Sequence, residues 1–68
     1  MNWKTFQKEC RKRGIRAVKF YNDMKVRITA PPRTAFAYSG TRNAEFNIGI
    51  DRMDYSGVYW WVKKGFDF

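Results

Sequence analysis

The sequence predicts an α+β domain in which an N-terminal helix packs on one face of a four- or five-stranded antiparallel sheet. Two patterns indicate this fold: helical spacing of apolar residues at the start, and short alternating segments after it. The length of 68 residues suits one domain. A chain this short buries only about 60% of the surface that it exposes when unfolded. We therefore expect residues 1–68 to form a single small basic domain whose core is mostly aromatic.

The first predicted element is a helix over residues 3–13. Asn2 is a suitable N-cap, and Gly14 is the residue expected just beyond the C-terminal end. Trp3, Phe6 and Cys10 follow helical spacing and form one apolar stripe. Four basic residues occupy an adjoining arc of the helix: Lys4, Lys8, Arg11 and Lys12.

Two strands follow, over residues 16–21 and 25–30, and their register depends on the loop between them. A two-residue turn would pair Phe20 with Lys25 and mix apolar with charged side chains. A three-residue loop pairs Phe20 with Val26 and leaves one apolar face, so we expect this register. It requires a left-handed conformation at Met24, which residues other than glycine avoid.

Three further strands are predicted after the prolines at 31–32 end the hairpin. Residues 34–39 form a weak strand, residues 46–51 a clear half-buried one, and residues 58–64 the last one. The single helix covers one face of this sheet. The apolar set expected at that interface is Trp3, Phe6, Cys10, Val18, Phe20, Val26, Ile28, Phe46, Ile48, Ile50, Val58, Trp60 and Val62.

The uncovered face of the predicted sheet combines aromatic and basic residues. Aromatic rings stack on nucleic-acid bases and cations neutralise phosphates, a mixture that suits a single strand better than a duplex. Lys19 stands opposite Arg27 there, and an anion bound between them would relieve their repulsion. The alternative is that Tyr59 and Trp61 pack beneath the tail or a loop for structural reasons. The expected binding residues are Lys19, Tyr21, Lys25, Arg27, Tyr59, Trp61 and Lys63.

The charge distribution also points to an anionic partner. The chain carries 14 Lys and Arg residues against six Asp and Glu, a formal charge of +8, and the whole excess lies in residues 1–33. Such asymmetry suggests nucleic acid, an anionic membrane or an acidic protein surface. The basic helix arc at Lys4, Lys8, Arg11 and Lys12 would lie along a phosphate backbone, or is simply the solvated face of the helix.

Composition excludes the common catalytic arrangements. The chain has no histidine and one cysteine, which leaves no usual zinc site and no Ser-His or Cys-His couple. Asp51, Asp54 and Glu45 form the one acidic cluster, and its sequence reads better as a turn than as a magnesium site. We therefore expect no enzyme activity, metal or cofactor. No uncharged stretch is long enough to span a membrane, and the unpaired thiol suits the cytoplasm.

The sequence thus predicts a small non-enzymatic domain that binds nucleic acid, with single strands or RNA favoured and with salt-dependent affinity. The competing hypothesis is a phage-type accessory or inhibitor protein that binds an acidic or nucleic-acid-binding surface of a host or defence protein complex. Exposed tryptophan, tyrosine and arginine residues would then be its interface hot spots. Homodimerisation through the uncovered face is a third option.

Overall fold

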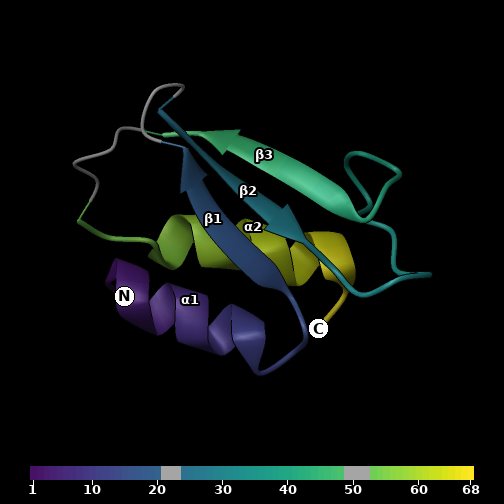
Figure 1. Ribbon diagram of the computed structural model, residues 1–68, viewed down its shortest axis with the longest axis horizontal. Coiled ribbons are helices and arrows are strands. Elements are labelled where there is room, and N and C mark those ends of the chain that lie inside the picture. Colours follow the sequence, from purple (N-terminus) through teal and green to yellow (C-terminus); the bar gives the residue numbers. More distant parts are fainter. Residues whose placement is uncertain (21–23, 49–52) are drawn as a thin grey trace.

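The computed structural model describes residues 1–20, 24–48 and 53–68. The described chain forms two helices and three strands (Figure 1). Their order and bounds are α1 (Trp3–Arg11), β1 (Arg16–Phe20), β2 (Lys25–Thr29), β3 (Asn43–Asn47) and α2 (Ser56–Phe66). Neither of these helices has the length and apolar character needed to cross a bilayer.

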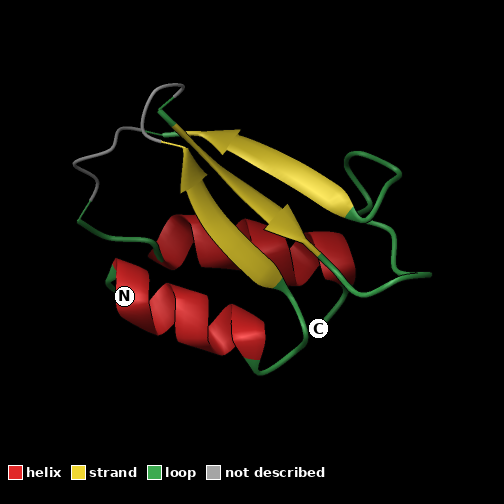
Figure 2. Cartoon of the chain, in the orientation of Figure 1, coloured by secondary structure: helices red, strands yellow, loops and turns green. Residues whose placement is uncertain are grey.

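The three strands form an antiparallel sheet in the order β1-β2-β3, with β2 in the centre. Both helices lie side by side on one face of this sheet and run in the same direction, whereas the other face is open (Figure 2). The α+β class, the N-terminal helix and the antiparallel sheet are confirmed. The expected fourth and fifth strands are not found in the described part of the chain, and a second helix shares the covered face.

Helix α1 begins after Asn2 as predicted and ends at Arg11, two residues before the predicted end. The side chain of Asn2 accepts a hydrogen bond from the Thr5 amide at 2.8 Å. At the other end Gly14 is left-handed, with φ of +74°, and its amide donates to the Arg11 carbonyl at 3.0 Å. The Ile15 amide donates to the Cys10 carbonyl at 2.9 Å, which completes a Schellman motif and turns the chain toward β1.

The register of the first hairpin differs from the predicted one. Phe20 pairs with Lys25 and Val18 pairs with Arg27, which is the register that the apolar pattern disfavoured. Val18 and Phe20 therefore lie half-buried on the open face, and Lys19 faces the helices opposite Val26. Met24 is left-handed, with φ of +51°, although the register that was expected to require this is not formed, and residues 21–23 lie outside the described residues.

Lys19 fits the covered face because its long side chain crosses aromatic rings. Its Nζ lies 4.6 Å from the centre of the Trp3 ring and 5.2 Å from that of Tyr55. A lysine at the edge of a sheet can bury its methylenes while its ammonium interacts with ring faces. Alternation of polar and apolar residues is a poor guide to register where a lysine behaves in this way.

The segment 58–64 is helical, so the strand predicted there is wrong. Val58 and Val62 are buried, and Gly65 follows them at helical spacing and is buried too. This stripe packs on the sheet, whereas the alternation of Val58, Trp60 and Val62 had suggested a strand. The C-terminal end is closed by Asp67 in a left-handed conformation, whose amide donates to the Lys63 carbonyl.

The segment 34–39 is also not a strand; it consists of turns that pack on the end of α2. The amide of Ala37 donates to the Gly65 carbonyl at 2.8 Å, and Phe36 is buried. The strand predicted over 46–51 is displaced toward the N-terminus, because β3 ends at Asn47, and residues 49–51 lie outside the described residues.

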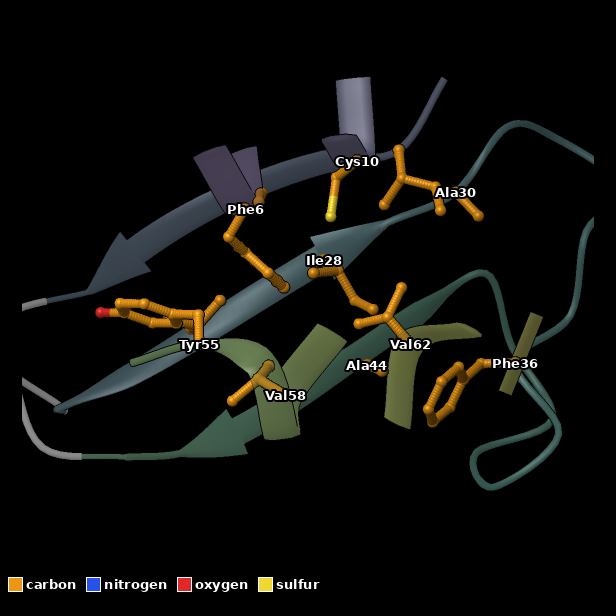
Figure 3. Packing of buried hydrophobic residues seen from close by; sticks show 12 residues of the cluster. Phe6, Cys10, Ile28, Ala30, Phe36, Ala44, Tyr55, Val58 and Val62 are labelled. Atoms are coloured by element: carbon orange, nitrogen blue, oxygen red, sulfur yellow. The ribbon is translucent and has the colours of Figure 1, made fainter. Parts of the chain in front are cut away.

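The core lies between the sheet and the two helices (Figure 3). Phe6, Ile28 and Val62 are fully buried at its centre, one from each of α1, β2 and α2. Several predicted core residues are therefore correct, but Trp60 is exposed and Ile50 lies outside the described residues. The core residues that the sequence pattern did not indicate are Ile15, Ala17, Ala30, Phe36, Ala44 and Tyr55.

Candidate nucleic-acid interface

The open face of the sheet retains two of the predicted binding residues, and both are paired with a carboxylate. Arg27 Nη2 lies 2.7 Å from Glu45 Oε2, and Lys25 Nζ lies 3.5 Å from the other oxygen of that carboxylate. The Arg27 hydrogen bond holds the pKa of Glu45 below its usual value. Arg27 also packs on Phe20, with its Cζ 4.8 Å from the ring centre. The Glu45 carboxylate therefore neutralises part of the positive charge that Arg27 and Lys25 bring to the open face.

The structure does not bring the other predicted residues onto that face. Lys19 points toward the helices, and Tyr21 lies outside the described residues. Tyr59, Trp61 and Lys63 belong to α2 on the opposite side of the sheet. The mixed aromatic and basic sheet face that the sequence predicted is therefore not formed, because the segment 58–64 is a helix.

Tyr59 packs much as the structural alternative supposed. It is half-buried between the helices, with its ring 6.2 Å from that of Phe6. Arg13, two residues beyond α1, and Lys63 of α2 each place their cationic group 5.9 Å from the centre of the Tyr59 ring. Trp61, in contrast, remains 46% exposed, and its ring lies 5.1 Å from that of Tyr38.

A different surface gathers the basic residues of α1. Lys8 stands two positions from each of the buried residues Phe6 and Cys10, so it projects about 160° away from both. Lys4 and Lys12 each stand two positions from one of these buried residues and six from the other, about 160° and 120° away, and all three lysines are exposed. The three lysines of the predicted basic arc therefore point away from the sheet into solvent, whereas Arg11 lines a hollow beside β1 with Ala17 and Val18.

Helix α2 contributes to the same side of the molecule. Trp60 stands two positions from both Val58 and Val62, so it too points away from the sheet and is 51% exposed. Lys64 follows one turn later, with its Nζ 4.6 Å from the centre of the Trp60 ring. We define the outer helix surface by its exposed residues, which are Lys4, Lys8 and Arg11 of α1, its C-cap residue Lys12, and Trp60, Lys63 and Lys64 of α2.

Trp60 and Lys64 are not among the binding residues that the sequence predicts. The strand predicted over residues 58–64 places Trp60 in the core. The helical spacing of Val58, Val62 and Gly65 was the available signal, since it puts Trp60 on the side away from the buried stripe.

A hollow of about 320 Å³ adjoins the end of α2. Its walls combine the aromatic side chains of Tyr38, Trp60 and Phe68 with the lysines Lys63 and Lys64. Asp67 lines it as well, so the hollow contains two cations and one carboxylate. This composition suits a flat ring that carries a negative group.

The acidic residues serve the fold locally. The Lys12 ammonium lies 3.0 Å from a Glu9 oxygen and lowers the pKa of that carboxyl. Asp54 accepts hydrogen bonds from the amide and hydroxyl of Ser56 at the start of α2, which lowers its pKa to about 2. Within residues 1–20, 24–48 and 53–68, no three metal-ligating side chains come together. Asp51 lies outside those ranges.

No protein-family model, curated protein or solved structure matches the chain. The function is therefore inferred from the position and surroundings of these residues.

Proposed function

We propose that the protein binds nucleic acid, with single strands or RNA favoured, through the outer helix surface and without catalysis. The observation that carries the proposal is the shared orientation of Lys8 and Trp60. Each projects away from the sheet, so a row of cations and an exposed indole face the same solvent. Cations neutralise phosphates, and an indole stacks on any base.

The hollow beside Trp60 favours a single strand over a duplex. An unstacked base can enter a space lined by rings, and its phosphate then lies within reach of lysines. A duplex keeps its bases stacked and offers α1 only its phosphates. We therefore expect tighter binding to single-stranded than to duplex oligonucleotides of equal length, with sequence-tolerant affinity that falls steeply with salt.

The side chains that commonly act in catalysis also favour a binding role over an enzymatic one. Histidine is absent from the sequence, and the single thiol, that of Cys10, is buried in the core. Asp54 and Glu45 are each engaged in hydrogen bonds to neighbouring groups. Asp54 does accept a hydrogen bond from the Ser56 hydroxyl, but a carboxyl group whose pKa is about 2 is a weak general base.

The test is a fluorescence-anisotropy titration with labelled single-stranded and duplex oligonucleotides at several salt concentrations. The charge comparison uses Lys8→Gln on α1 and Lys25→Gln on the open face, because each removes one positive charge. Lys8→Gln should weaken binding and reduce the slope of log affinity against log salt by about 0.7 for a single strand. Lys25→Gln should leave both nearly unchanged. A larger effect of Lys25→Gln would place the binding site on the open face of the sheet instead.

The aromatic comparison uses two neighbouring tryptophans of similar exposure. Trp60→Ala should cost about 1–3 kcal/mol of binding free energy, or roughly five- to 150-fold in affinity, because it removes a stacking platform. Trp61→Ala should cost less than Trp60→Ala, since Trp61 does not line the hollow at the end of α2 and touches it only through its ring contact with Trp60, 5.6 Å between centres. Equal losses in both variants, or no binding by the parent at low salt, would contradict the proposal.

A further inference from the structure

A hollow of about 430 Å³ lies between the end of α1 and the start of β1. Helix and strand lie side by side there (Figure 1), and the Gln7 side chain joins them by donating to the Ala17 carbonyl at 3.1 Å. We call this space the β1 hollow. Its lining residues are Gln7, Arg11 and residues 14–18.

Two arginines line the β1 hollow, and their positive charges are not balanced there. Arg11 ends α1, Arg16 begins β1, and both are exposed. Among the described residues, no carboxylate lines the hollow, and no hydrogen bond or ion pair engages either guanidinium group. Glu9, the acidic residue of α1, pairs with Lys12 instead. Charge therefore favours an anion in this hollow.

The main chain at this edge of the sheet offers a donor. The Ala30 amide donates to the Arg42 carbonyl on the β3 side, so Ile28, two residues earlier, also directs its main chain toward β3. Ala17, which pairs with Ile28, therefore directs its amide and carbonyl outward. The carbonyl already accepts from Gln7, whereas no acceptor in the described part of the chain pairs with the amide. The Ala17 amide is thus a third donor for an anion.

The end of α1 opposes an anion only weakly. It carries the negative pole of the helix dipole, a partial charge of about half a unit. The Cys10 carbonyl accepts from the Ile15 amide at 2.9 Å, and the Arg11 carbonyl accepts from the Gly14 amide at 3.0 Å. These bonds satisfy carbonyls of the last turn, and the two guanidinium charges outweigh the pole that remains.

The donors indicate an anion with three free oxygens. A guanidinium binds an oxyanion best through two parallel N–H···O bonds, so two guanidinium groups on one anion engage three oxygens when they share one of them. A carboxylate and an internal phosphodiester each have two such oxygens. A phosphate monoester has three, and its charge of about −1.5 to −2 matches two arginines.

We propose that the β1 hollow binds the terminal phosphate monoester of a single-stranded nucleic acid. Arg11 and Arg16 each donate a pair of hydrogen bonds to it, and the Ala17 amide donates one more. Lys8 precedes Arg11 by three residues, so the two are neighbours on α1 and the hollow continues the outer helix surface. This role rests on the proposed function, because that surface supplies the strand whose end enters the hollow.

The test compares single-stranded oligonucleotides of one sequence that carry a phosphate on the 5′ end, on the 3′ end or on neither. The fluorescent label sits inside the strand, so that both ends are free, and anisotropy gives the affinity. We expect a terminal phosphate to raise the affinity about tenfold or more, as charge-assisted hydrogen bonds do. A gain at either end supports the proposal and identifies the end that occupies the hollow. Blocking that phosphate with a methyl group leaves two free oxygens and should remove most of the gain.

Variants separate this site from the outer helix surface. Arg16 lies outside that surface, so Arg16→Gln should leave the affinity for the hydroxyl-ended strand nearly unchanged and remove the gain from the terminal phosphate. Arg16→Lys keeps the charge without the planar fork and should also lose most of the gain. Lys8→Gln is the matched control, because it should weaken binding of both strands and preserve the gain.

Equal affinity for phosphorylated and hydroxyl-ended strands would overturn this proposal. The proposed function would still stand if both strands bind and Lys8→Gln weakens them, whereas the absence of all binding at low salt would remove both. A gain that persists in Arg16→Gln would place the terminal phosphate elsewhere. A glutamate-rich peptide that binds the parent and not Arg16→Gln, with no gain from a terminal phosphate, would assign the hollow to an acidic protein.

Discussion

Replacing Gly65 with alanine puts a methyl group where the ring of Phe36 lies. A Cβ atom at Gly65 would fall 1.7, 2.2 and 2.4 Å from three carbons of that ring, far inside van der Waals contact. The ring has little room to move, because its centre lies 4.9 Å from that of Phe66 and 6.1 Å from that of Phe46. Either Phe36 leaves its site or the end of α2 shifts.

The expected loss follows from two opposing effects. Overpacking of a core costs about 1–3 kcal/mol, and displacing a buried phenylalanine into water costs about 1.5–3 kcal/mol. Alanine recovers about 1 kcal/mol, since it favours the helix more than glycine does. Gly65→Ala should therefore lower the free energy of unfolding by up to about 2 kcal/mol. In a domain of this size each kcal/mol lowers the melting temperature by about 4–8 °C.

The matched control is Gly57→Ala in the first turn of the same helix. A Cβ atom at Gly57 meets no atom within 4 Å, and the residue is exposed. This variant should gain about 0.5–1 kcal/mol, so the two alanine substitutions are expected to have opposite signs. Urea unfolding followed by circular dichroism measures both. If Gly65→Ala is as stable as Gly57→Ala, Phe36 does not pack against α2 as described.

Three further predictions concern single groups. Burial raises the pKa of the Cys10 thiol to about 11, so a thiol reagent at pH 8 should react only after the protein unfolds in urea; rapid reaction of the folded protein would contradict its burial. Hydrogen bonds from Ser56 lower the folded-state pKa of Asp54 to about 2, so the carboxylate stabilises the fold above about pH 4 and this contribution is lost as the pH falls toward 2. The difference in melting temperature between the parent and Asp54→Asn should shrink over that range, and a constant difference would refute the assignment. Gly14→Ala forces alanine to a φ of +74° with its Cβ 3.0 Å from Pro31, and should lower the free energy of unfolding by about 1–2 kcal/mol; unchanged urea unfolding would contradict this.

The sequence alone determined the features that depend on neighbouring residues. Asn2 and Gly14 bracket α1 because a side-chain cap and a left-handed glycine act within one helical turn. The same local reasoning put Lys4, Lys8 and Lys12 on the polar side of that helix. The first hairpin is also predictable from the sequence, since two short segments that contain β-branched residues flank a turn.

Tertiary structure decided the register of the hairpin and the nature of α2. The inward position of Lys19 depends on the Trp3 and Tyr55 rings that receive its ammonium, and no alternation pattern reveals those rings. The segment 58–64 carries tyrosine, tryptophan and valine, which favour strands, and its apolar residues fit either period. The helix prevails because Val58, Val62 and Gly65 together bury one stripe against the sheet and Phe36, a gain that exists only once the distant segments have packed.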